Sequence, residues 1–197
     1  MIRPDPALGV FETIRVQHGR ALHLEDHLAR LRSSVRELYG IAFEPQLPEL
    51  PEAPCRLRIT VLPSGEATTK LAPLGEPNLI LAPWTVPGGL GAHKWADRRA
   101  VTEATQRLGA TPLILDEDGS VLEAAWANVW VREAGRLVTP AADGRLLPGV
   151  TRARLLRTEP DAAEEPLTLE RLEAADVIML TSALRGAVEA RLQRPIT

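Results

Sequence analysis

Hydrophobic and polar residues alternate along several early segments of the chain, which is the pattern of half-buried β-strands. In residues 55–62, for example, Leu57, Ile59 and Val61 fall on one face and Arg56, Arg58 and Thr60 on the other. The same signal, interrupted by glycine and proline turns, extends to neighbouring segments. The predicted strands of the first half are residues 10–17, 21–24, 55–62, 66–73 and 78–83.

A helical period replaces this alternation after residue 24. Apolar residues recur at spacings of four, three, four and three, and Gly40 follows as a C-terminal cap. The pattern predicts a helix over residues 25–39 with one buried stripe, made of Leu24, Leu28, Leu31, Val35 and Leu38.

The second half of the chain predicts both element types. Helices are expected over 96–109, 150–157 and 167–175, strand hairpins around 117–119 and 134–135, and a buried strand at 177–182. The proline- and glycine-rich segment before this half suggests a linker. We therefore predict an α+β protein with two small domains of mainly antiparallel sheet and flanking helices, divided as 1–86, a linker at 87–92, and 93–197.

Composition narrows the class of partner. A net charge of -3 gives no basic field for nucleic acid, and 45% hydrophobic residues suit a globular protein that binds a small molecule. No apolar stretch is long enough for a membrane span, and the spacing of the histidines predicts no metal site. The single cysteine, Cys55, precludes internal disulfides and indicates the cytoplasm.

Lysine is scarce in a way that draws attention to one residue. The chain has 23 lysines and arginines, and its lysines are Lys70 and Lys94. A lysine amine can lose its proton and form an imine with a carbonyl, whereas arginine stays charged. Lys70 lies in a predicted strand, where a solvent-facing position explains it. Lys94 is therefore the candidate for covalent chemistry, with a chance surface position as the alternative.

Three other positions are candidates for binding a charged ligand. Glu123 lies in an apolar segment, so it is either at an exposed strand end or buried with a cationic partner. The Pro148-Gly149 start of a helix that contains Thr151 suits a phosphate, although a plain turn is the simpler explanation. Arg30 is either solvated or a phosphate clamp, and periodicity does not decide between them.

Taken together, ordered segments of the chain resemble the class IV, or fold-type IV, pyridoxal-phosphate (PLP) enzymes. This family includes branched-chain and D-amino-acid aminotransferases and aminodeoxychorismate lyase. The segments that carry the resemblance are GVFETIRV (9–16), HLARL (27–31), HK (93–94), SVLEAAWANVWV (120–131), LVTP (137–140), LLPGVTR (146–152) and MLTSALRG (179–186).

The resemblance implies a role for each site residue. Lys94 would bind the cofactor covalently and move protons, and Glu123 would pair with the ring nitrogen. Arg30 would bind the phosphate with help from the backbone and side chains around Val150, Thr151, Ser182 and Ala183, and Leu147 would pack on the ring. The substrate would contact Phe11, Thr13, Trp126 and Arg185.

The ending TSALRGAVEARL and the segment EAAWANVWV are most similar to aminodeoxychorismate lyases. The implied reaction converts 4-amino-4-deoxychorismate into 4-aminobenzoate and pyruvate, a step of folate biosynthesis, in a homodimer. The alternatives are a D-amino-acid or branched-chain aminotransferase with the same cofactor, and a binding module of the same fold without catalysis.

Overall fold

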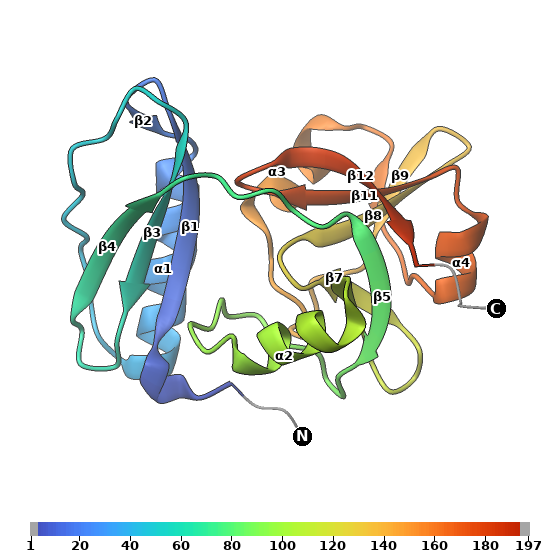
Figure 1. Cartoon of the computed structure of the whole chain (residues 1–197), viewed down its shortest axis with the longest axis horizontal. Helices are drawn as coiled ribbons and strands as arrows, with labels where there is room; N and C mark the ends of the chain where they lie inside the picture. Colours follow the sequence, from blue (N-terminus) through green and yellow to red (C-terminus); the bar gives the residue numbers. More distant parts are fainter. Residues whose placement is uncertain (1–3, 194–197) are drawn as a thin grey trace. The chain divides into compact units, whose positions relative to one another are not determined.

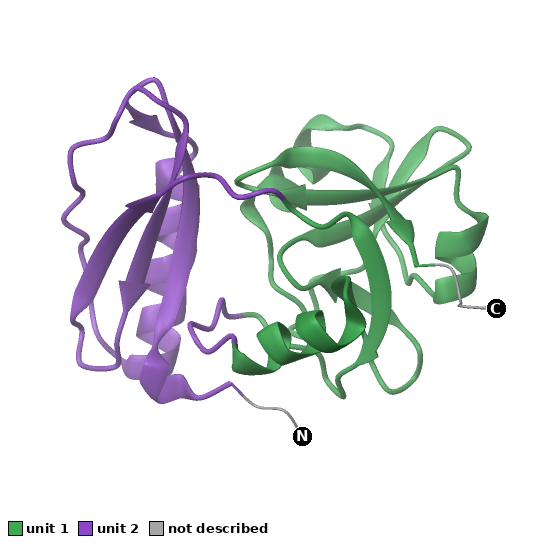
Figure 2. Cartoon of the chain, viewed as in Figure 1, with its two compact units in different colours: residues 1–3, 77–92, 99–197 green, residues 4–76, 93–98 purple. Residues whose placement is uncertain are grey.

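The computed structural model describes residues 4–193, which form two compact units, each built around its own sheet (Figure 2). The smaller unit comprises residues 4–76 and 93–98, and the larger comprises residues 77–92 and 99–193. This division differs from the predicted one at 87–92. Strand β5 (Ile80–Thr85) pairs within the larger sheet, and residues 93–98 return to the smaller unit because they bridge to its first strand.

The smaller unit is an antiparallel sheet with one long helix on one face (Figure 1). The strand order is β2-β1-β3-β4, and the predicted strand at 21–24 is replaced by a two-residue strand and the start of the helix. The elements are a 3-10 turn at Pro6–Leu8, β1 (Val10–Gln17), β2 (Arg20–Ala21), α1 (Leu24–Tyr39), β3 (Cys55–Val61) and β4 (Ala67–Ala72).

The predicted patterns account for how this unit packs. Alternate residues of β3 are buried, and they form one core with the apolar stripe of α1, including Leu28, Leu31 and Val35. Gly40 ends the helix in the left-handed conformation and donates its backbone N–H to the carbonyl of Arg36. The sheet therefore has one face covered by α1 and one without a helix.

The larger unit contains an eight-stranded mixed sheet in the order β10-β9-β8-β11-β12-β5-β6-β7. Most neighbours are antiparallel, as predicted, and the pairs β9–β10, β12–β5 and β5–β6 are parallel. The remaining elements are α2 (Arg99–Leu108), β6 (Thr111–Leu115), β7 (Val121–Ala124), β8 (Asn128–Glu133), β9 (Arg136–Thr139), α3 (Val150–Thr158), β10 (Ala162–Glu164), α4 (Leu169–Ala174), β11 (Val177–Ser182) and β12 (Gly186–Leu192).

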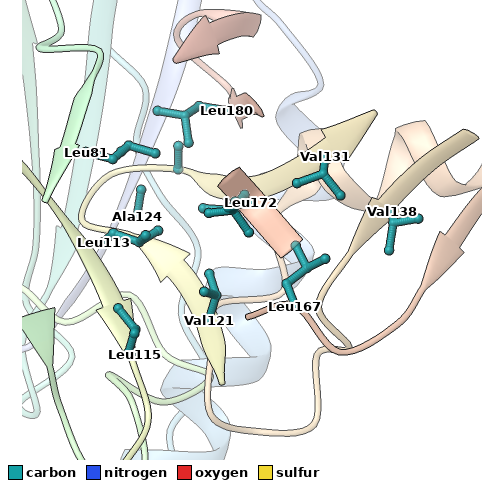
Figure 3. Close-up of a cluster of buried hydrophobic side chains, with 12 residues drawn as sticks. Leu81, Leu113, Leu115, Val121, Ala124, Val131, Val138, Leu167, Leu172 and Leu180 are labelled. Carbon is teal, nitrogen blue, oxygen red and sulfur yellow. The ribbon is translucent and has the colours of Figure 1, made fainter. Parts of the chain in front are cut away.

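A cluster of aliphatic side chains fills the core of this sheet (Figure 3). Leu113 of β6, Val131 of β8 and Leu180 of β11 are fully buried within it, and Leu172 of α4 closes one side. The two hairpins and the helices at 150–158 and 169–174 confirm the expectations from the sequence. No helix among residues 4–193 is long and apolar enough to cross a membrane.

Two strands of the larger unit were not predicted, and one differs in burial. β10 has three residues, too few for a periodic signal, and β12 alternates only exposed and half-buried positions. β11 was expected to be fully buried, but its first three residues are only half-buried. β11 lies between β8 and β12 in the sheet, but its apolar sequence still overstated how deeply its side chains are buried.

Candidate active site

Lys94 is held in the smaller unit by backbone hydrogen bonds to the start of β1. Its carbonyl accepts from the N–H of Phe11 at 2.8 Å, and the N–H of Ala96 donates to the carbonyl of Gly9 at 2.9 Å. Gly9 has a φ of +84°, and a Cβ there would lie 2.2 Å from the carbonyl oxygen of Val61. Only glycine fits, so the strand that anchors the lysine segment depends on it.

The side chains around Lys94 come from the sheet and the helix. Its Nζ lies 5.3 Å from the centroid of the Phe11 ring, within the range of a cation–π contact. The neighbouring His93 forms a 3.0 Å hydrogen bond through Nδ1 with Ser34 of α1, and its ring meets Trp95 edge to face. The segment that carries the lysine is thus attached to both β1 and α1.

Arg30, predicted as a phosphate clamp, lies in a buried ionic cluster with Glu12. The Glu12 carboxylate accepts from Arg30 Nε at 2.7 Å and Nη2 at 2.9 Å, and from His27 Nδ1 at 2.9 Å. Burial alone would raise the pKa of Glu12, but the charges of Arg30 and Lys94 and the hydrogen bond with His27 hold it well below its ordinary value. Neither Glu12 nor His27 was predicted as a site residue, because neither has a distinctive motif by itself.

The face of the small sheet without a helix is rich in cations. Side chains directly opposite one another across antiparallel strands share a face, and Arg58 of β3 lies between Thr13 of β1 and Lys70 of β4. This face carries Phe11, Thr13, Arg15, Arg56, Arg58, Thr60, Thr68, Lys70 and Ala72, and no carboxylate. The Arg58 guanidinium stacks 3.8 Å from the centroid of the Phe11 ring.

Three of these cations, Arg56, Arg58 and Lys70, are neighbours on this face. Among the residues that the structure describes, no carboxylate lies within ion-pair distance of Arg56, Arg58 or Lys70, and the Nε of Arg56 is buried without a hydrogen-bond partner. Burial and the positive charge of Arg56 lower the pKa of Arg58. Like charges opposite one another destabilise a sheet, so this face is suited to an anion.

Glu123 lies in the larger unit, buried on β7 opposite Ile114 of β6. Its carboxylate accepts from the N–H of Leu147 at 3.3 Å, and the Leu147 carbonyl accepts from Asn128 Nδ2 at 2.8 Å. The burial decides the alternative left open by the sequence, since Glu123 is only 6% exposed. The predicted residues Glu123 and Leu147 are brought together by a direct hydrogen bond.

The helix start at 148–151 is formed as predicted. Gly149 is the extended N-cap of α3, Val150 is buried and Thr151 is half-buried. A Cβ on Gly149 would lie 1.9 Å from Oδ1 of Asn128, so the backbone passes too close to that side chain for any other residue. The first N–H groups of α3 therefore follow a loop whose residue Leu147 is hydrogen-bonded to Glu123 and Asn128.

The last predicted residues lie at the end of β11 and beside the core. α3 packs against β11, which ends at Ser182, and the Ser182 hydroxyl oxygen is buried with no hydrogen-bond partner among the described residues. Ala183 and Arg185 are half-buried in the turn that follows. Trp126 packs against two clusters of buried hydrophobic side chains within the larger unit and donates Nε1–H to Thr111 at 3.2 Å, so its role in substrate binding stays a prediction.

The sequence model of the class IV amino-transferases matches residues 9–192. The chain belongs to this family. Enzymes of the class IV aminotransferase family depend on PLP, and the family and fold predicted from the sequence are therefore confirmed. The match covers both units and includes every predicted site residue.

Individual relatives of this class IV chain differ in name. A branched-chain-amino-acid aminotransferase-like protein 1 of Arabidopsis thaliana is 27% identical over 75% of the chain, which spans only 34% of that relative. The aminodeoxychorismate lyase of Bacillus subtilis is 26% identical over 90% of the chain and 74% of its own length. A solved Mesorhizobium loti structure, assigned to the amino-acid aminotransferases, is 31% identical with a TM-score of 0.82, covering 93% of this chain and 99% of that one.

The residues present fit the phosphate of the class IV cofactor. The buried Ser182 hydroxyl lacks a partner, and such groups are normally satisfied. The backbone at Gly149 leaves α3 an N-terminus without a side-chain cap. A phosphate oxygen would satisfy both kinds of donor. No group of three or more His, Cys, Asp or Glu residues within 4–193 is arranged to hold a metal ion.

Proposed function

We propose that this chain is a PLP-dependent lyase that converts 4-amino-4-deoxychorismate into 4-aminobenzoate and pyruvate. The observation that carries the choice is the cationic sheet face with Arg56, Arg58 and Lys70 beside Phe11. The lyase substrate has one carboxylate on its cyclohexadiene ring and a second on the enolpyruvyl group attached to that ring, whereas a branched-chain amino acid has one carboxylate and an apolar side chain. Similarity to the lyase of Bacillus subtilis supports the same choice.

Most of the predicted residues have a part in the proposed reaction. When bound, PLP withdraws electrons and stabilises negative charge at the substrate carbon that bears the amino group. Lys94 would accept the proton from that carbon while the C–O bond to the enolpyruvyl group breaks and the ring becomes aromatic; the released enolpyruvate takes up a proton to become pyruvate. Glu123 would keep the ring nitrogen of PLP protonated by accepting its hydrogen bond. Arg30, Thr151 and Ser182 bind the phosphate, with the backbone at Val150 and Ala183.

The substrate contacts and the assembly belong to the same proposal. Phe11 and Thr13 support the ring of the substrate next to the Lys94 amine, with Trp126 and Arg185 as further contacts. We also propose that the active protein is a homodimer, as the resemblance to the family implies. Sedimentation of the protein loaded with PLP tests this, and a monomer that retains full activity would contradict it.

The assay for the reaction needs no second substrate. The purified protein is incubated with PLP and aminodeoxychorismate, and 4-aminobenzoate and pyruvate are measured separately. We expect equal amounts of both products without any added keto acid, and none from Lys94→Ala. Lys70→Ala, assayed at saturating substrate, should still release both products because it retains the Lys94 amine.

An aminotransferase is the second candidate, because the Arabidopsis thaliana relative has an aminotransferase-like name and the Mesorhizobium loti protein is assigned to that class. Such an enzyme would require a keto acid as acceptor and would transfer the amino group of a branched-chain or D-amino acid. Turnover of those amino acids with 2-oxoglutarate, together with no release of 4-aminobenzoate, would replace the first proposal with the second.

A further inference from the structure

Glu12 is the most deeply buried ion-paired carboxylate among the residues that the structure describes. Its side chain is 1% exposed, and the Arg30 side chain bound to it is 13% exposed. Removing a carboxylate from water is costly, so three strong hydrogen bonds at one buried position indicate a purpose beyond packing. The apolar core of this unit continues through Ile59, the residue opposite Glu12 on β3.

The partners of Glu12 lie on a polar stripe of α1 next to its apolar stripe. His27 and Arg30 are three residues apart and so share one side of the helix. Ser34, one turn further, bonds to His93, the residue before Lys94. The exposed Glu37 continues the stripe and lies 3.7 Å from Nε2 of the same histidine. One side of α1 therefore contacts both the Glu12 cluster and the lysine segment.

The direction of the hydrogen bond with His27 follows from the charge of Glu12. The pKa of this carboxyl is well below its ordinary value, so it has no hydrogen to donate at neutral pH. The Nδ1 of His27 must therefore carry the hydrogen that lies between them. His27 acts as a donor that fixes the Glu12 carboxylate, and Nε2 of its ring is buried without a partner among the described residues.

We propose that Glu12, fixed by His27, is a positioning residue that orients the guanidinium of Arg30 toward the cofactor phosphate. Glu12 binds the Nε edge of the guanidinium through Nε and Nη2. The rigid planar group then directs its Nη1 hydrogens and the outer Nη2 hydrogen away from Glu12. An arginine held in this way loses less conformational freedom when it binds an anion.

This inference rests on the proposed function, because it assumes that Arg30 binds the phosphate. Glu12 could either position Arg30 or only neutralise its charge, and the two roles predict opposite changes in phosphate binding when Glu12 is removed. If Glu12 only offset the charge of Arg30, its removal would strengthen phosphate binding through the additional positive charge. If Glu12 orients Arg30, its removal weakens phosphate binding although the site becomes more positive.

The test compares the binding of PLP with that of pyridoxal, which lacks the phosphate. Apoprotein is titrated with each compound by absorbance and protein fluorescence, and the ratio of the two dissociation constants isolates the phosphate contribution. We expect Glu12→Gln and Arg30→Gln each to reduce this preference by about tenfold or more, the effect of losing charge-assisted hydrogen bonds. The matched control is Glu44→Gln, which removes an exposed carboxylate from Arg32 on the same helix.

A second pair of variants serves if Glu12→Gln does not fold, as judged by circular dichroism. His27→Leu removes the donor and should lower the preference for PLP, whereas His27→Asn keeps a donor and should restore much of it. An unchanged or increased preference in Glu12→Gln, or in His27→Leu, would overturn the role of Glu12. A wild-type protein without any preference for PLP, or an Arg30→Gln variant that keeps it, would instead refute the proposed phosphate site, and the inference with it.

Discussion

Replacing Gly149 with alanine tests how closely the loop before α3 must approach β8. The added Cβ would lie 1.9 Å from Oδ1 and 3.1 Å from Cγ of Asn128, a buried residue. Either the loop or the Asn128 side chain must move. Both movements disturb the 2.8 Å bond from Asn128 to the carbonyl of Leu147, and with it the Leu147 N–H that donates to Glu123.

The expected loss of unfolding free energy in Gly149→Ala is the sum of three effects. Overpacking at a site without free space costs about 1–3 kcal/mol. Loss of one buried hydrogen bond adds about 1 kcal/mol, and alanine in place of glycine at an N-cap adds roughly 0.5 kcal/mol. We therefore expect Gly149→Ala to lower the free energy of unfolding by about 2.5–4.5 kcal/mol.

Urea unfolding of the apoprotein, followed by circular dichroism and tryptophan fluorescence, measures this change. Gly75→Ala is the matched control, because a Cβ at Gly75 meets nothing within 4 Å and its φ is not positive. PLP affinity is measured on both variants, and only Gly149→Ala should lose it. A Gly149→Ala protein as stable as Gly75→Ala, with unchanged affinity for PLP, would refute the close approach of loop and strand.

Three further results are expected. Ser182→Ala should weaken PLP binding about tenfold. The apoprotein should be as stable as wild type or slightly more stable in thermal unfolding, because the hydroxyl is buried without a partner among the described residues. A clear loss of apoprotein stability would contradict this. The folded pKa of Glu12 is below its ordinary value of 4.5, so its carboxylate stabilises the fold above that pH and loses this effect as the pH falls below it. The difference in unfolding free energy between wild type and Glu12→Gln should therefore be largest near neutral pH and shrink below about pH 4.5, and a difference that stays constant on acidification would exclude the linkage. Arg58→Gln and Lys70→Gln should raise KM for aminodeoxychorismate by about tenfold with little change in kcat, since each removes a charged contact to a carboxylate; an unchanged KM in steady-state assays would remove the cationic face from the substrate site.

The sequence predicted local structure well where one period persisted over many residues. The stripe of α1 and the alternation of β3 each specify one buried face, and Gly40 marks the end of the helix through its backbone freedom. β10 and β12 were not predicted, because their sequence patterns are short or weakly amphipathic and these strands gain stability mainly from their neighbours in the sheet. Such tertiary pairing leaves little trace in the local sequence.

The candidate site was predicted only in part, for a similar reason. Lys94 was conspicuous by its rarity, and Glu123 by its apolar surroundings. Glu12 and His27 lie fifteen residues apart and meet only after α1 packs on the sheet, so neither position was distinctive alone. The return of residues 93–98 to the smaller unit depends on backbone bonds with β1, which a composition-based boundary does not reveal.

The central claim is that the Lys94 amine forms the covalent bond to the cofactor. The direct measurement is borohydride reduction of the protein loaded with PLP, followed by proteolysis and mass spectrometry of the modified peptides. Since the chain contains only two lysines, each can be assigned separately. We expect one pyridoxyl phosphate group on Lys94 and none on Lys70. Modification of Lys70 alone, or no modification of Lys94 at saturating PLP, would contradict it.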